Sequence, residues 1–164
     1  MTMTTAEKTV EAFKNKNMTI TAAESCTGGL IAKMITDVPG ASAVFELGVC
    51  SYSNRIKTNV LGVPKEIIDE YTELSEECAR EMAIGAMRLS GADVAVSTTG
   101  VAGPAGGTDK DPVGTVYIAL AADGNVVSEK RNFNEDGCCD RDTIRQKCAD
   151  YVLNMAMEYA LRCP

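Results

Sequence analysis

The sequence predicts a single α/β domain over residues 1–164, in which helices cover both faces of a mixed, mostly parallel sheet in three α/β/α layers. Apolar residues make up 45 % of the 164-residue chain, which is enough for a substantial core. Segments of helical period alternate with short strand patterns in the order α-β-α-β-α-α-β-β-β-α. The pair Asp123-Gly124 separates the last two strand patterns and is typical of a tight antiparallel hairpin.

Patterns in the first fifty residues predict two helices and two strands. An amphipathic helix is expected over 4–15, followed by a short buried strand over 18–23. Apolar residues at helical spacing over 30–35 predict a second helix, which the Asp-Val-Pro-Gly sequence of 37–40 ends. Alternating apolar residues over 43–51 predict the next strand.

Two short helices are expected next. Ser53 or Asn54 can cap a helix that reaches Leu61, and Gly62 then ends it. Pro64 suits the first position of another short helix, because its fixed backbone angle matches the helix and it needs no N–H acceptor.

A longer helix and a strand lead to an irregular segment. Ser75 caps a helix whose first turn is acidic, and Gly91 ends it. The residues 93–98 read as a strand. The following stretch, 99–114, is too rich in glycine and proline to form a regular element.

The chain ends with a hairpin and a long helix. The strands 115–121 and 126–133 form the hairpin. Asp140 can cap the final helix. The apolar residues expected on the inner face of that helix are Ile144, Cys148, Tyr151, Val152, Met155 and Tyr159.

Composition excludes several classes of function. The chain contains no histidine, so it has neither a Ser-His-Asp triad nor a histidine-ligated metal. It has no tryptophan, and aromatic residues make up only 5 %, which argues against a protein that stacks nucleic-acid bases. The net charge of −7 argues against both nucleic acid and anionic membranes as partners. An anionic ligand would need a local basic pocket.

Cysteine usage and hydropathy favour a cytoplasmic protein. No signal peptide precedes the first helix, and no stretch approaches the length of a membrane span. The seven cysteines are odd in number and mostly lie in apolar segments, so we expect free thiols. No CxxC pair occurs, and the adjacent Cys138 and Cys139 suit a metal poorly, so neither a metal nor a cofactor is expected. A homodimer or higher homo-oligomer is expected from the apolar sheet and a methionine-bearing helix.

The first candidate site follows the first strand, where Glu-Ser-Cys-Thr-Gly-Gly leads into a helix. Ser25 would lie at the carboxyl edge of the sheet, where open α/β folds bind ligands. Backbone N–H groups around Thr27, Gly28 and Gly29 suit an oxyanion or a phosphate. A plain capped helix start would show the same residues.

The second candidate is Tyr-Ser-Asn-Arg-Ile-Lys, at the start of another helix. A serine nucleophile needs a base, and in a chain without histidine Lys57 is the natural substitute. The amine must be neutral to accept a proton, and burial or the neighbouring Arg55 could lower its pKa. Tyr52 could relay the proton or orient Lys57. A solvated surface lysine is the alternative.

Two further motifs suit an anion. The loop over 97–108, with Gly100 and Gly103, can wrap backbone donors around a phosphate or sugar, although it is not a P-loop. Arg141 and Arg145 lie four residues apart at the start of the final helix, where the helix dipole disfavours cations. They are therefore either held for a phosphate or paired with neighbouring acids.

Taken together, these motifs resemble the C-terminal domain of the CinA (competence-damage-inducible protein) family. The resemblance covers roughly residues 18–162, and the order of the motifs is preserved. The matching motifs are Ala23–Gly29, Asp37–Gly40, Tyr52–Asn54 with Lys57, Gly100–Pro104 with Gly106-Gly107, Pro112–Val116, and Asp140-Arg141 with Arg145.

The resemblance implies a three-layer α/β/α fold and hydrolysis of nicotinamide mononucleotide to nicotinic acid mononucleotide and ammonia, a step of pyridine-nucleotide salvage. It implies that Ser25 is the nucleophile, that Lys57 and Tyr52 assist it, and that Arg145 belongs to the site. The nucleotide phosphate would rest on the loop and on Arg141 or Arg145. No metal is implied.

The sequence departs from the family in two places. Cys139 precedes Asp140 where the family usually has glycine, which alters the turn that aims the arginines. Arg55 and Ile56 stand where the family tends to carry a small acidic or alanine pair.

Other interpretations stay open at this level. Cys26 is a rival nucleophile, since a thiol at a helix start can have a lowered pKa. A non-catalytic nucleotide- or phosphate-binding module would use the same glycine loops, with Lys57 only neutralising charge. An assembly protein of the competence or DNA-repair machinery would bind nucleic acid, which the acidic composition disfavours.

Overall fold

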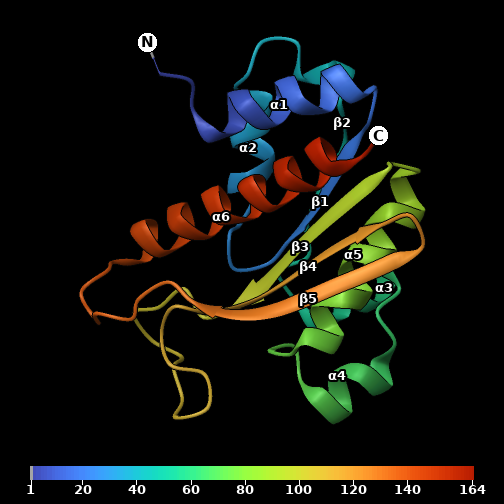
Figure 1. The fold of residues 1–164 in the computed structure, drawn as a ribbon. Helices are drawn as coiled ribbons and strands as arrows, with labels where there is room; N and C mark the ends of the chain where they lie inside the picture. Colours follow the sequence, from blue (N-terminus) through green and yellow to red (C-terminus); the bar gives the residue numbers. More distant parts are fainter. Residues whose placement is uncertain (1) are drawn as a thin grey trace.

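A mixed five-stranded sheet in the order β2-β1-β3-β4-β5 forms the centre of the computed structural model, which describes residues 2–164 (Figure 1). β1 pairs in parallel with β2 and β3, whereas β4 pairs antiparallel with β3 and β5. Within the described chain, four strands therefore share one direction and β4 runs against them. The strands are β1 (Ile20–Glu24), β2 (Phe45–Cys50), β3 (Val94–Gly100), β4 (Thr115–Ala122) and β5 (Asn125–Asn132).

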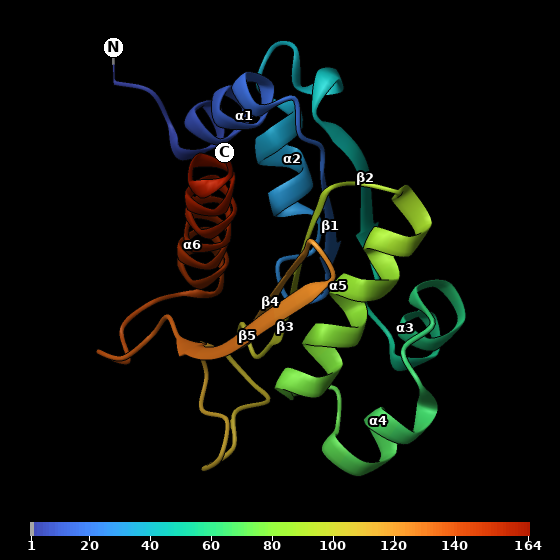
Figure 2. The ribbon, with the colours of Figure 1, turned by 45° about the vertical axis from the view of Figure 1, so that its right-hand side comes forward.

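Helices cover both faces of the sheet, which confirms the predicted three layers (Figures 1 and 2). One face carries α1 (Thr5–Lys16), α2 (Leu30–Thr36) and α6 (Arg141–Arg162). The opposite face carries α3 (Asn54–Leu61), α4 (Lys65–Tyr71) and α5 (Glu76–Ser90). A 3₁₀ turn, η1 (Ala41–Ala43), precedes β2.

Each face of the sheet has its own apolar core. Phe13, Ile31 and Leu153 are fully buried between the sheet and the layer formed by α1, α2 and α6. On the other face, Leu61 and Met82 pack between the sheet and α5. Both cores rest on β1, β3 and β4, which are buried almost throughout, and this burial gives the sheet a rigid centre.

The helix boundaries follow the capping signals. The side chains of Ser53, Ser75 and Asp140 each accept a backbone N–H from the first turn of their helix, as predicted. Pro64 is the N-cap residue of α4 and so lies one position earlier than expected. β3 continues to Gly100, beyond the predicted end, because it keeps pairing with β4 there.

The strand order creates a crevice at the carboxyl end of β1. The chain leaves β1 through α2 to reach β2 on one side, then crosses the other face through α3, α4 and α5 to β3 on the far side of β1 (Figure 2). Connections that diverge in this way leave a crevice where α/β folds bind ligands. No helix within residues 2–164 is long and apolar enough to cross a membrane.

Candidate active site

Ser25 is the first residue after β1 and begins the turn that leads into α2. Its N–H donates to Thr98 O of β3 at 2.9 Å, and its carbonyl accepts the N–H of Gly28 at 3.1 Å. The Thr27 and Thr98 hydroxyls are hydrogen-bonded at 2.8 Å within the buried interior. The backbone of the turn is thereby fixed to the neighbouring strand, so that the position of the Ser25 hydroxyl is well defined.

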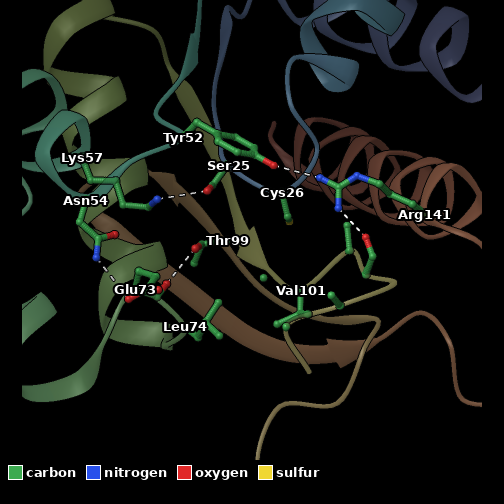
Figure 3. A pocket seen from close by; sticks show the side chains of 15 residues that line it. Ser25, Cys26, Tyr52, Asn54, Lys57, Glu73, Leu74, Thr99, Val101 and Arg141 are labelled. Atoms are coloured by element: carbon green, nitrogen blue, oxygen red, sulfur yellow. Dashed lines mark hydrogen bonds between the residues drawn. The ribbon is translucent and has the colours of Figure 1, made fainter. Parts of the chain in front are cut away.

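Lys57 lies on α3 and reaches the same point from the connection that follows β2 (Figure 3). Its Nζ lies 3.1 Å from Ser25 Oγ and donates to Ser51 O at 2.9 Å. The side chain is only 1 % exposed. The two residues are brought together because parallel β1 and β2 end at the same edge of the sheet.

The environment of Lys57 favours its neutral form. Burial lowers the pKa of its amine below the ordinary value, because a charged ammonium loses its hydration there. The nearby groups that act against this shift are Cys78, Glu73 and Cys26. Arg55, which could have contributed, is exposed and is not among the causes of the shift. The arrangement suits a lysine that accepts a proton from a serine hydroxyl.

A cavity of about 320 Å³ opens beside this pair. The predicted loop closes its far side, with Gly100 and Gly103 in the wall. The lining residues are Ser25, Cys26, Tyr52, Asn54, Lys57, Glu73, Leu74, Thr99–Gly103, Ala105, Gly106 and Arg141. Three strand-to-helix or strand-to-loop connections thus contribute to one cavity at the carboxyl edge of the sheet.

Tyr52 lies in the cavity wall but contacts a different partner from the expected one. The residue is 63 % exposed, and its hydroxyl accepts a hydrogen bond from Arg141 Nη2 at 2.9 Å. The backbone carbonyl of Ser51, rather than this hydroxyl, orients Lys57. Arg141 also donates to Gly103 O at 2.5 Å, so it joins the glycine loop to Tyr52 at the rim of the cavity.

Arg145 is separated from Arg141 and does not line this cavity in the described chain. Its Nε and Nη2 donate to Thr27 O at 3.1 and 2.5 Å. Gly28 lies beneath the guanidinium, where a Cβ would come within 2.6 Å of Nη2, and its φ of +61° also favours glycine. The structure therefore places Arg145 against the turn that carries Ser25, where it fixes the backbone.

Glu24 forms a helix cap that no sequence signal predicts, because it reaches α2 from the end of β1. The carboxylate is 1 % exposed and accepts the N–H groups of Gly29, Ile31 and Ala32 at 2.9 to 3.1 Å. These groups are therefore not free for a substrate. The N–H of Gly28 is likewise hydrogen-bonded within the turn, to Ser25 O. A role of Gly28 and Gly29 as oxyanion donors stays a prediction.

The comparisons with known proteins agree with this architecture. The model of the CinA C-terminal domain matches residues 2–160. The chain belongs to the CinA C-terminal domain family. A crystal structure of a CinA superfamily protein from Klebsiella pneumoniae 700603 has a TM-score of 0.90 and 30 % identity, and the match covers 97 % of both chains.

Relatives in the CinA family differ in length. The chain is 42 % identical to nicotinamide-nucleotide amidohydrolase PncC of Escherichia coli K12, over 98 % of this chain and 95 % of the relative. It is 50 % identical to a CinA-like protein of Geotalea uraniireducens over 76 % of this chain. That match spans only 30 % of the relative, so the chain corresponds to about a third of the length of such relatives.

The turn before α6, where the sequence departs from the usual CinA pattern, keeps its capping function. Asp140 Oδ1 accepts the N–H of Thr143 at 2.8 Å. The N–H of Cys139 donates to Asn134 Oδ1 at 2.8 Å. The cysteine in place of glycine therefore leaves α6 starting at Arg141, and this arginine reaches the rim of the cavity.

Cys26, the rival nucleophile, also lines the cavity and is 7 % exposed. A hydrogen bond from the Cys148 thiol lowers the pKa of the Cys26 thiol, whereas burial acts in the opposite direction. Its hydrogen-bond partners are Cys148 and Thr98, while the Lys57 amine is hydrogen-bonded to Ser25. The geometry thus pairs the candidate base with Ser25.

We expect Glu24→Gln to lower the free energy of unfolding by about 2 kcal/mol, because a buried carboxylate acceptor of three N–H groups would become an amide with one acceptor oxygen. Urea unfolding followed by circular dichroism measures this change. Glu11→Gln on the exposed side of α1 is the matched control and should stay within about 0.5 kcal/mol of the parent. Equal stability of the two variants would contradict the capping role.

Proposed function

We propose that the chain hydrolyses the carboxamide of nicotinamide mononucleotide, giving nicotinic acid mononucleotide and ammonia. The contact of 3.1 Å between Ser25 Oγ and the buried Lys57 Nζ, inside a cavity, carries this proposal. The nearly full-length similarity to a protein named nicotinamide-nucleotide amidohydrolase supports the same reaction. A place in pyridine-nucleotide salvage, a cytoplasmic location and assembly as a homodimer or higher homo-oligomer belong to the proposal.

In the proposed mechanism, Ser25 Oγ attacks the carboxamide carbon while neutral Lys57 takes the hydroxyl proton. The tetrahedral intermediate collapses as the C–N bond breaks, and Lys57 returns the proton to the departing ammonia. Water then attacks the acyl-enzyme ester, again with Lys57 as the base. The ester bond to Ser25 Oγ then breaks, Lys57 returns its proton to that oxygen, and the acid leaves and loses its proton to water as the carboxylate.

The oxyanion of this intermediate needs donors that the fold leaves unused. The N–H groups of Cys26 and Thr27 have no backbone acceptor among residues 2–164. They follow the nucleophile directly in a turn that Arg145 and Thr98 hold in place. We assign the oxyanion to these two groups, and a donor of this kind typically contributes about 3 to 4 kcal/mol to the stability of the transition state.

The phosphate belongs at the other end of the cavity. Arg141 lies there beside the glycine loop, and a guanidinium binds phosphate through two parallel N–H groups. Its present partners, Tyr52 and Gly103, hold it at the rim. A phosphate contact for Arg145 stays a prediction, since its guanidinium is hydrogen-bonded to Thr27 O.

The deciding experiment measures ammonia release from nicotinamide mononucleotide by the wild-type chain beside Lys57→Ala. Ammonia from the wild type and none from the variant would support the hydrolase. Binding of the nucleotide without turnover by the wild type would instead favour a nucleotide-binding module. The structure favours the hydrolase because the lysine is buried against a serine rather than exposed to a phosphate.

Arg141→Ala should raise KM for nicotinamide mononucleotide by about tenfold or more and change kcat little, because it removes a phosphate contact remote from the reacting amide. Steady-state kinetics with the mononucleotide and with nicotinamide riboside, which lacks the phosphate, test this. The riboside should be turned over equally by both proteins. A similar loss with both substrates would mean that Arg141 only supports the loop. Arg162→Ala, at the exposed end of α6, is the control.

A further inference from the structure

We infer that Glu73 is a specificity-determining residue that recognises the positive charge of the pyridinium ring. This inference rests on the proposed function and deepens it, since it names the charge of the ring as a feature that the site selects. Glu73 lies in the short connection between α4 and α5 and lines the same cavity as Lys57, where it contacts Asn54 and Thr99 (Figure 3).

Both the backbone and the side chain of Glu73 are held by residues of the same cavity. Its carbonyl accepts the Thr99 hydroxyl at 2.8 Å. Its Oε2 accepts Asn54 Nδ2 at 3.3 Å. The residue is half-buried. These contacts fix a carboxylate at the cavity wall, whereas an unrestrained surface glutamate would extend into water.

The charges around the cavity leave this carboxylate without a cationic partner. Glu73 is the single acidic residue among the described lining residues, and within residues 2–164 it forms no ion pair. Lys57 is hydrogen-bonded to Ser25 and Ser51 O. Arg141 is engaged at the opposite rim. A cation that enters the cavity would meet a carboxylate that no ion pair compensates.

This distribution complements a zwitterionic nucleotide. The proposed mechanism takes Lys57 as neutral, so the charged side chains that line the cavity are then Glu73 and, at the rim, Arg141. In nicotinamide mononucleotide the cationic ring nitrogen lies within the ring that bears the carboxamide, and the phosphate lies at the far end of the ribose. Placing the amide at Ser25 therefore brings the cation toward Glu73 and the phosphate toward Arg141, which electrostatic complementarity favours.

The effect of Glu73 on Lys57 supports the same assignment. Glu73 raises the pKa of the Lys57 amine and so acts against the neutral base that the mechanism requires. When substrate is bound, the positive charge of a pyridinium ring beside Glu73 offsets the effect of the carboxylate on the Lys57 pKa. The Glu73 charge therefore disfavours the neutral base in the empty site, and the charge of the ring compensates it in the complex.

Binding to a non-hydrolysing protein tests the inference. In a Ser25→Ala background, calorimetry would measure Kd for nicotinamide mononucleotide and for the 5′-phosphate of benzamide riboside, in which a neutral ring replaces the pyridinium. We expect the added Glu73→Gln change to weaken binding of the cationic ligand about tenfold and to leave the neutral ligand within about twofold. Glu70→Gln on exposed α4 is the matched control and should affect neither ligand.

Two outcomes would overturn the inference: equal weakening of both ligands by Glu73→Gln, or no weakening of either. An unchanged thermal midpoint establishes that the variant is folded. The test does not depend on turnover. If the wild type binds the cationic mononucleotide more tightly than the neutral analogue but releases no ammonia, the hydrolase proposal fails and the role of Glu73 in recognition stands.

Discussion

Replacement of Ser25 by alanine is expected to reduce kcat for ammonia release by about 10⁴-fold or more, because the covalent step loses its nucleophile. The side chain is small and the backbone of the turn is fixed by Thr98, Gly28 and Arg145. We therefore expect the fold and the Kd for nicotinamide mononucleotide to change little. A coupled ammonia assay and calorimetry measure the two quantities on the same protein.

Cys26→Ala is the matched control for this prediction. Both residues line the cavity, yet the Lys57 amine contacts Ser25. Cys26→Ala should therefore retain kcat within about tenfold, the loss coming from altered packing against Cys148. Full activity of Ser25→Ala together with an inactive Cys26→Ala would show that the Cys26 thiol is the nucleophile and would refute the Ser–Lys mechanism.

Lys57→Met is expected to abolish ammonia release, also by about 10⁴-fold or more, while the free energy of unfolding stays equal or rises. Methionine fills a similar volume but cannot accept the proton. Because burial disfavours the ammonium of Lys57, folding must either bury that charge or release its proton, and an apolar side chain removes this cost. Ammonia assays and urea unfolding at pH 7 measure both effects.

The pH dependence of the wild type and of Lys57→Met distinguishes the role of Lys57 in activity from its effect on stability. In the proposed mechanism the neutral amine is the active form, so kcat/KM of the wild type should rise with pH and level off above the Lys57 pKa, which lies below its ordinary value. The Lys57 pKa is lowered in the folded state and ordinary in the unfolded state. Between these two values the unfolded chain binds more protons than the folded one, so the free energy of unfolding also rises with pH. Lys57→Met should lack this slope. Loss of stability in Lys57→Met would contradict the cost assigned to the buried amine.

Local sequence signals were sufficient to predict the scaffold of the site. A polar turn after one parallel strand and a capped helix after the next place Ser25 and Lys57 at the same edge of the sheet, and the structure brings them within 3.1 Å. This prediction required only the order of strands and helices. The caps at Ser53 and Asp140 were predictable for the same reason, since each acts within its own helix turn.

Contacts between distant segments were not predictable in this way. Tyr52 and Arg141 are 89 residues apart, and their hydrogen bond depends on how α6 packs against the sheet. Arg141 and Arg145, four residues apart, were equal candidates for the phosphate, yet they reach the glycine loop and the Ser25 turn separately. The cap formed by Glu24 also depends on the spatial approach of a strand end to a helix start.

The connections after β1 and β2 run to opposite sides of β1, and this arrangement affects how the residues of the site can change in evolution. The proposed nucleophile follows β1, the proposed base follows β2 and the glycine loop follows β3, so each lies on a separate segment of the chain. Changes of length or composition in the loop can alter the end of the cavity where we propose that the sugar and phosphate bind, while the Ser25–Lys57 pair keeps its spacing. The proposed hydrolytic step can in this way be retained by descendants that accept different amides.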